Sequence, residues 1–148
     1  MFRALGRDER GTQLVELALV VPLMLMLVGA TAEFGRFFYT YSTLSKATRA
    51  GARYQISQVP GTNFAQTKNL VVYGNTAGTG TAVASGLTAA NVSVVENKNA
   101  AGAVQTVSVS ISGYGYTPIF DLGKLTKSAT LSLAVNVAPS STMRQLVQ

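Results

Sequence analysis

The sequence has no cysteine, no histidine and no tryptophan among its 148 residues. Without cysteine the chain can form no disulfide and offers no thiolate nucleophile. Without histidine it also lacks the commonest general base and the commonest ligand of transition metals. Beyond residue 11 the acids are Glu16, Glu33, Glu96 and Asp121. They are too few and too scattered for an evident carboxylate pair or calcium site, so we expect no enzyme, no cofactor and no metal.

Charge is scarce as well, because only 12% of the residues are charged, although the formal net charge is +6. A basic balance can attract nucleic acid or anionic lipid, but its sign alone decides little. Lys46, Arg49 and Arg53 form a basic stripe without interleaved aromatic side chains, which favours a solvated face over a nucleic-acid site. Serine, threonine, glycine and alanine dominate the second half. That composition suits a β-rich surface outside the cytoplasm, and we expect no nucleic-acid partner.

The N-terminal third divides into three segments. Residues 1–11 are short and charged, and residues 14–32 carry no charge except Glu16. As a helix this apolar run would be about 28 Å long, which is membrane length. Residues 33–58 look amphipathic, and no strong helix breaker separates them from the apolar run. The pattern predicts one helix from about residue 12 to 57, ending before Pro60-Gly61, with a transmembrane part at 14–32 and an amphipathic part at 33–58.

The amphipathic part has an apolar face whose members recur at steps of three or four. They are Phe34, Phe37, Tyr41, Leu44, Thr48 and Ala52. Glu33 and Arg36 are three residues apart, so they can form a local pair at the membrane interface or bridge neighbouring subunits. Pro22 removes a helix hydrogen bond and is expected to kink the helix.

Residues 59–148 predict a β-rich globular head. Alternation is clearest in 107–112, where Val107, Val109 and Ile111 face one way, and in 131–137. Segment 91–96 and segment 103–112 predict a hairpin, 69–73 is a shorter strand candidate, and 74–86 reads as a loop. One side of such an antiparallel sheet is apolar and needs a cover. The face of helix 33–58 can supply it, so the fold class expected is α+β: a long helix packed on a small antiparallel sheet.

The glutamate at the start of the apolar run has three possible explanations. The run could be a plain membrane anchor with Glu16 near enough to the interface to reach the headgroups. It could also be a secretory signal cut at Ala30-Thr31-Ala32, which would leave a secreted chain beginning at Glu33. The third explanation takes RGTQLVE, residues 10–16, as a unit: a basic leader, a glycine, four residues and then a glutamate at the head of an apolar helix.

This unit resembles the prepilin processing motif of type IV pilin-like proteins. The resemblance implies that a membrane peptidase cuts after Gly11, that Thr12 becomes the new N-terminus, and that residues 1–11 are a leader. The new α-amino group would lie one helical turn from Glu16. In a low dielectric a carboxylate strongly attracts an ammonium group, its own or that of the adjacent subunit. Such a pair would make Glu16 the residue that sets assembly register.

Residues 11–54 resemble the opening of TadE-like proteins, which are pilin-like components of Tad (Flp-type) pilus systems. The matching features are the Gly-Thr start with Glu16, Pro22 in the apolar run, Glu33-Phe34-Gly35-Arg36, and the ending Ala50–Tyr54. A looser similarity across 91–137 includes the Tyr116-Thr117-Pro118 turn.

The resemblance implies a structural subunit, minor or major, of a Tad-like pilus or secretion filament. Its partners would be other pilin subunits, a prepilin peptidase, an inner-membrane assembly platform and membrane lipid. It would reside in the bacterial inner membrane before assembly and in a periplasmic or extracellular filament afterwards. The alternative is a membrane-anchored or secreted domain that binds or adheres through its polar loops at 74–102.

Overall fold

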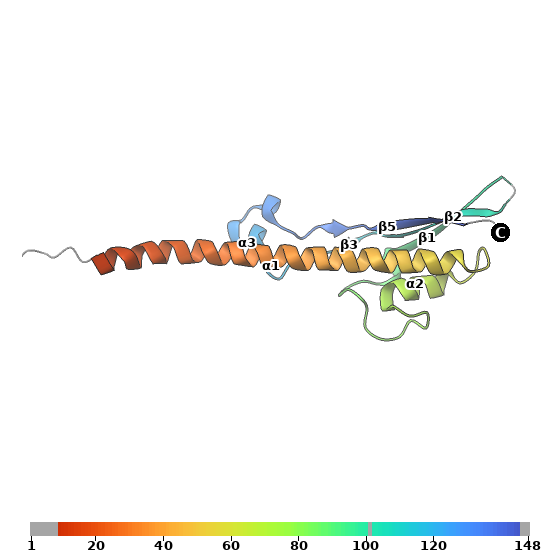
Figure 1. Cartoon of the computed structure of the whole chain (residues 1–148), viewed down its shortest axis with the longest axis horizontal. Coiled ribbons are helices and arrows are strands. Elements are labelled where there is room, and N and C mark those ends of the chain that lie inside the picture. The colour runs from red at the N-terminus through yellow and green to blue at the C-terminus, as the bar shows by residue number, and fades with distance from the viewer. Residues whose placement is uncertain (1–8, 101, 146–148) are drawn as a thin grey trace, which may run out of the picture.

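The structure is a computed structural model that describes residues 9–100 and 102–145, with side chains from residue 11 onward. Its dominant element is α1, Glu9–Ile56, a continuous helix of 48 residues that is about 72 Å long at 1.5 Å per residue. Figure 1 shows that the rest of the chain gathers around the distal part of α1, whereas its N-terminal part extends alone. Most of the leader expected at residues 1–11 lies outside the described residues.

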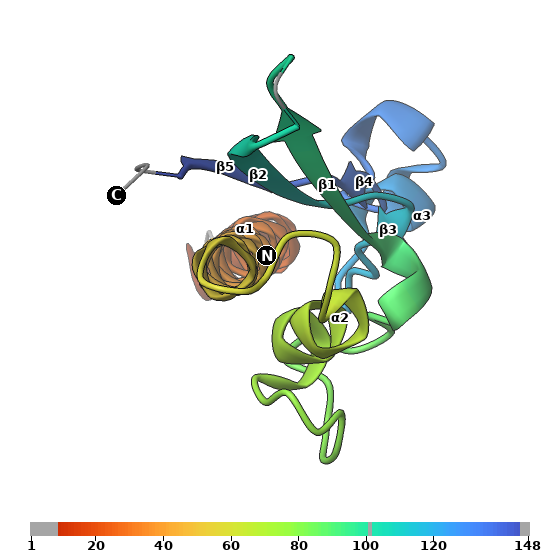
Figure 2. The same cartoon turned by 90° about the vertical axis from the view of Figure 1, so that its right-hand side faces the viewer.

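The distal part of α1 packs against a helix and a sheet, and the two helices lie next to each other on one side of that sheet, as Figure 2 shows in a view along the axis of α1. The helix is α2, Phe64–Tyr73. The sheet has the order β1-β2-β5 and is antiparallel throughout, with β1 at Val92–Lys98, β2 at Val104–Ile111 and β5 at Ser140–Arg144. The α+β class and the packing of the long helix on a small antiparallel sheet are therefore confirmed.

The hairpin expected at 91–96 and 103–112 is present as β1 and β2, with Val94 opposite Val109. Alternation on β2 is as predicted, since Val107, Val109 and Ile111 are all buried toward α1 and α2. The buried apolar core also includes Leu44 and Ala52 from α1, Val71 and Val72 from α2, and Leu87, Val92, Val104, Tyr114, Tyr116 and Val137.

The strand expected at 69–73 is wrong, because these residues form the second half of α2. Val71 and Val72 are consecutive and both fully buried, which a helix that packs on both α1 and β1 allows and a half-buried strand does not. The helix ends at Gly74, whose positive φ of 73° closes the last turn through a bond from its N–H to the carbonyl of Leu70. That glycine was the sequence signal for a helix end.

The strand expected over 131–137 is also wrong for most of its length. Only Asn136–Val137 pairs, as β4, with β3 at Tyr114–Gly115. Upstream of β4, Ala129–Leu131 form the 3₁₀ turn η2, so Leu131, the first residue of the expected strand, belongs to a turn. Ser132 then donates to the carboxylate of Asp121 at 3.0 Å, and its hydroxyl accepts from the N–H of Ala134 at 3.1 Å. Local side-chain bonds of this kind compete with a sheet ladder.

A buried polar cluster ties the far end of α1 to α2 and β1. The amide nitrogen of Gln55 donates to the Thr62 carbonyl and to Glu96, both at 2.8 Å, and Thr67 donates to the Gln55 carbonyl oxygen. Glu96 also accepts from the N–H of Gly61 at 2.9 Å. Every buried side-chain nitrogen and oxygen in the described part of the chain has a partner, so this cluster fixes the α1–α2 turn without leaving an unpaired group.

The approach of α2 to α1 depends on a glycine. A Cβ placed on Gly51 would lie 2.5 Å from Cγ2 of Val71, whereas a Cβ on Gly35 would meet no other atom within 4 Å.

We predict that Gly51→Ala lowers the free energy of unfolding by about 1–3 kcal/mol through overpacking. Gly35→Ala should raise it by up to about 1 kcal/mol because alanine favours helix. Denaturant unfolding of the full chain in detergent micelles compares the two; equal gains for both variants would show that the two helices are not in close contact.

Candidate assembly and membrane-boundary site

The apolar run of α1 is not covered by the rest of the described chain. All the large apolar side chains from Leu14 to Val28 are exposed, with Leu14 at 67% and Leu19 at 74%. Within the described residues α1 is the one helix long and apolar enough to cross a membrane. A helix that is hydrophobic on all sides needs either lipid or other helices around it, and no other part of the described chain reaches it before Gly29.

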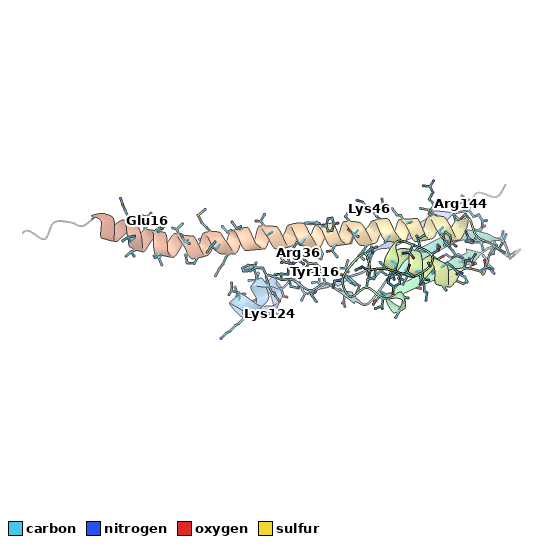
Figure 3. The ribbon with its side chains drawn as sticks, turned by 90° about the horizontal axis from the view of Figure 1, so that it is seen from below. Glu16, Arg36, Lys46, Tyr116, Lys124 and Arg144 are labelled. Carbon is cyan, nitrogen blue, oxygen red and sulfur yellow. The ribbon has the colours of Figure 1, made fainter. Side chains whose placement is uncertain are left out.

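Glu16 projects from this bare run, as Figure 3 shows. It is exposed, and so are Gly11 and Thr12, which α1 includes because the helix begins at Glu9. Among the side chains that the structure describes, the one ion pair is that of Arg36 with Glu33. Glu16 therefore has no cationic partner in the described part of its own chain. The helix also runs on through Pro22, and the kink expected there stays a prediction.

Glu33 lies just beyond the apolar run and has the opposite environment. Its side chain is 3% exposed. One carboxylate oxygen accepts from the hydroxyl of Tyr116 at 2.5 Å, and the other accepts from the N–H of Phe120 at 3.0 Å. Arg36 completes the site at 3.1 Å. This carboxylate therefore joins α1 to a segment more than 80 residues further along the chain.

The electrostatics of the pair follow from these contacts. Burial of Glu33 raises its pKa, but the hydrogen bonds from Tyr116 and Phe120 and the charge of Arg36 outweigh it, so that the net shift is downward. Burial raises the pKa of Tyr116 to about 12, and its bond to the Glu33 carboxylate acts in the same direction. The ionised carboxylate and the neutral phenol are thus both favoured by folding.

These two shifts define a pH window. A lowered carboxyl pKa contributes stability above the ordinary value of about 4.3, and this stability is lost as pH falls through the lowered pKa. A raised phenol pKa contributes stability that is complete below about pH 10 and is lost as pH rises. The contact between Glu33 and Tyr116 should therefore hold from about pH 5 to pH 10.

Tyr116 also packs on α1 with its ring. The Phe37 and Tyr116 centroids are 5.3 Å apart with an interplanar angle of 86°, an edge-to-face contact. A groove of about 560 Å³ opens beside this contact, lined by Arg36, Tyr39, Ser85 and Tyr114 among others. Figure 3 shows Arg36 and Tyr116 close together on this side of α1.

The head covers only part of the apolar face that the sequence predicted for α1. Leu44, Thr48 and Ala52 are fully buried and Phe37 is half-buried, but Phe34 and Tyr41 are nearly half exposed. The covered positions are Glu33, Phe37, Leu44, Thr48, Ala52 and Gln55. Lys46, Arg49 and Arg53 are all exposed. The head thus covers a face that begins with a carboxylate, and it leaves Phe34 and Tyr41 on the adjacent one.

The described residues contain no group of three or more His, Cys, Asp or Glu side chains that could hold a metal ion. What they contain is a long helix that emerges bare from a small α+β head, with a buried carboxylate at the boundary.

A comparison with protein families gives a match to the N-terminal part of the chain. Residues 11–53 match the family model described as TadE-like protein, which confirms the resemblance over this segment. No curated protein and no solved structure matches the chain. The match includes Gly11, Thr12, Glu16 and Glu33, and it ends before the head that supplies Tyr116 and Phe120.

Sequence reasoning missed Tyr116 and Phe120 as partners of Glu33. The pair Glu33–Arg36 followed from helical spacing, but nothing in the spacing of Tyr116-Thr117-Pro118 pointed to α1. The available signal was the glutamate itself: a carboxylate on the side of a helix that faces the head needs a donor from the head.

We predict that Tyr116→Phe destabilises the docking of the head on α1 by about 1.5–3 kcal/mol, because it removes a hydrogen bond to a charged group and leaves the ring contact. The control is Tyr114→Phe, which removes a bond from another buried tyrosine to the neutral carbonyl of Ser85 and should cost only about 0.5–1.5 kcal/mol.

Denaturant midpoints in detergent, measured at neutral pH and at a series of values below pH 4, test both the size and the cause of the destabilisation by Tyr116→Phe. The deficit of Tyr116→Phe should shrink as the pH falls through the lowered pKa of Glu33, because the stability that the hydrogen bond to the charged carboxylate provides is then lost. Equal costs for the two variants, or a deficit that does not change with pH, would contradict the role given to the Glu33 carboxylate.

Proposed function

We propose that this chain is a structural, pilin-like subunit, minor or major, of a Tad-like pilus or secretion filament. The observation that carries the proposal is the bare apolar run of α1 with Glu16 upon it, inside the segment that matches the TadE-like family. Lipid covers such a helix in the inner membrane, and packing against the helices of other subunits covers it in a filament. The partners proposed are other pilin subunits, a prepilin peptidase and an inner-membrane assembly platform.

The processing step concerns the peptide bond between Gly11 and Thr12. Both residues lie within the first turns of α1, so cleavage there leaves a helix that starts at a free amine. Thr12 and Glu16 are four residues apart and share one face of the helix. The new ammonium group therefore forms beside a carboxylate that has no cation to meet in the described part of its own chain.

The assembly step brings this carboxylate to the amine of the adjacent subunit. About five helical turns at 3.6 residues per turn separate Glu16 from Phe34, so both lie on the same face of α1. Tyr41 is within about 20° of that face. An adjacent helix that meets Glu16 and follows this face would cover the two aromatic side chains that the head leaves exposed. This supports Glu16, Phe34 and Tyr41 as parts of one subunit contact.

The groove beside Tyr116 favours a second candidate, a membrane-tethered binding domain. It is about 560 Å³ in volume, and the loop at residues 83–85 forms one of its walls. A domain of this kind would remain a monomer on its anchor and would need neither cleavage nor a partner for Glu16.

The two candidates differ in the N-terminus of the mature protein. We predict that N-terminal sequencing or intact-mass measurement of the chain from its native host finds Thr12 as the first residue. A chain that begins at Glu33 would indicate a secreted domain cut after Ala32, and one that still carries residues 1–11 would indicate a plain anchor.

We further predict that Glu16→Ala inserts into the membrane normally but reduces incorporation into filaments by more than about tenfold, because removing one partner of a buried ion pair costs about 3–5 kcal/mol. The control is Gln13→Ala, which changes an exposed polar residue in the same turn and should leave the yield unchanged. Membrane fractionation and the yield of sheared filaments measure the two steps. Normal filament yield from Glu16→Ala would rule out the pairing mechanism.

A further inference from the structure

A small lobe of the head reaches back along α1 toward the membrane. It comprises residues 119–133 and contains α3, Leu122–Thr126, and η2; we call it the α3 lobe. Figure 1 shows α3 beside the middle of α1, well separated from the β1-β2-β5 sheet. The lobe packs closely on α1 at Gly29, where a Cβ would lie 2.8 Å from the ring of Phe120.

The contact at Gly29 fixes the height of the lobe. Gly29 is one turn inside the end of the apolar run at 14–32, so Phe120 packs against the last turn of that segment. Beyond the run, the exposed Tyr39 and Tyr41 lie about 10 and 14 Å along the helix from Ala32, the last residue of the run, and tyrosines are enriched at membrane–water interfaces. The α3 lobe is therefore level with the boundary between hydrocarbon and headgroups.

The surface of the lobe is amphipathic. Its exposed apolar side chains are Ile119 at 81%, Leu125 at 54% and Leu131 at 51%. Lys124 and Lys127 are exposed, and neither belongs to an ion pair with another described residue. Figure 3 shows Lys124 pointing away from α1. The one acid of the lobe, Asp121, is occupied with the Gly123 N–H at 2.9 Å and the Ser132 hydroxyl at 3.0 Å.

We infer that the α3 lobe rests on the bilayer surface, with Ile119, Leu125 and Leu131 among the lipid chains nearest the interface and Lys124 and Lys127 on anionic phospholipid headgroups. Two observations select lipid as the occupant. The lobe is packed on the same helix that spans the membrane, so lipid lies at its level in a single inserted copy. Its free lysines also match the charge of anionic headgroups, as for basic residues beside other membrane spans.

The hydrogen bond between Glu33 and Phe120 fixes the position of the α3 lobe along α1. Because Phe120 is held by its N–H on Glu33 at 3.0 Å and by its ring on Gly29, the lobe cannot slide along α1. Its lipid contact would then fix the distance from the bilayer to the rest of the head. The inference rests on the membrane-spanning part of the proposed function and is independent of processing and assembly.

The absence of cysteine makes a direct test possible. Ala129 in the lobe and Ala103 at the distal hairpin are both exposed alanines, so Ala129→Cys and Ala103→Cys give matched sites for an environment-sensitive fluorophore. The full chain is placed in nanodiscs at one copy per disc, made either of phosphatidylcholine or of an equal mixture with phosphatidylglycerol. Lipids with a nitroxide on the headgroup quench any fluorophore at the surface.

We expect the label at residue 129 to be quenched and the label at 103 to stay bright. Phosphatidylglycerol should increase the quenching at 129. Lys124→Gln with Lys127→Asn should remove that increase, because each lysine near an anionic surface shifts the equilibrium about fivefold. Asparagine is chosen because Lys127 has a φ of 53°, which asparagine tolerates. The control pair, Lys98→Gln with Arg144→Gln, removes equal charge at the distal end and should change nothing.

Three results would overturn the inference: equal brightness of the two labels, an increase of quenching with phosphatidylglycerol that persists without Lys124 and Lys127, or shielding of residue 129 only when two copies share a disc. The last would assign the surface to a second copy. Co-elution with the nanodisc separates these results from failure of the anchor, since a chain that does not co-elute refutes the membrane-spanning helix as well.

Discussion

The fold depends on a carboxylate at the point where α1 leaves its apolar run. Glu33 is almost fully buried and is bound by Tyr116, Phe120 and Arg36. A buried charge is tolerated only when it is paired and hydrogen-bonded, so the Tyr116–Phe120 segment must stay against α1 for as long as Glu33 is ionised. This requirement explains why a head whose main core lies around Leu44 to Ala52 also reaches down to Gly29. The carboxylate holds the end of the head nearest Gly29 in place, and the Gln55 cluster holds the distal end.

The two glutamates of α1 differ in where their partners lie. Glu33 has all its donors within the chain, whereas Glu16 has no cation in the described part of the chain and stands on a surface that is exposed all round. The same contrast applies to the helix as a whole, since its distal half is covered by α2 and the sheet, whereas residues 11–28 are all exposed. Folding of a single copy satisfies one half of α1 only. The other half needs a second environment, which is the physical basis for proposing a subunit of an assembly.

The features that were predictable from the sequence are those with a period or a local spacing. The long helix, the alternation of Val107, Val109 and Ile111, and the Glu33–Arg36 pair belong to this kind. The errors arose where β-branched runs suggested strands: Val71 and Val72 lie in a helix closed by Gly74, and 131–137 is held off the sheet by Ser132. The Glu33–Tyr116 contact joins residues 83 apart, and no pattern in a single sequence encodes such a separation. Phe34 was assigned to the covered face because it continues the apolar spacing of Phe37 and Tyr41, but the head covers its charged neighbour Glu33 instead.

The covered and exposed faces of α1 together explain how one subunit could serve in two environments. Gly29 and Glu33 hold the head on one face of the helix, and Glu16 lies about 100° around the axis from Glu33. An adjacent helix can therefore approach Glu16 without displacing Phe120 from Gly29. At Phe34, which lines a cavity with Phe120 and Leu131, it would meet the edge of the α3 lobe. The head would keep its position on α1 during the change from lipid to protein surroundings, because the face that exchanges lipid for a neighbouring helix is not the face that binds the head. Only the lipid contact of the α3 lobe would have to be released. That contact is made through two exposed lysines, so it would be weaker than the hydrogen bonds of the buried carboxylate beside it.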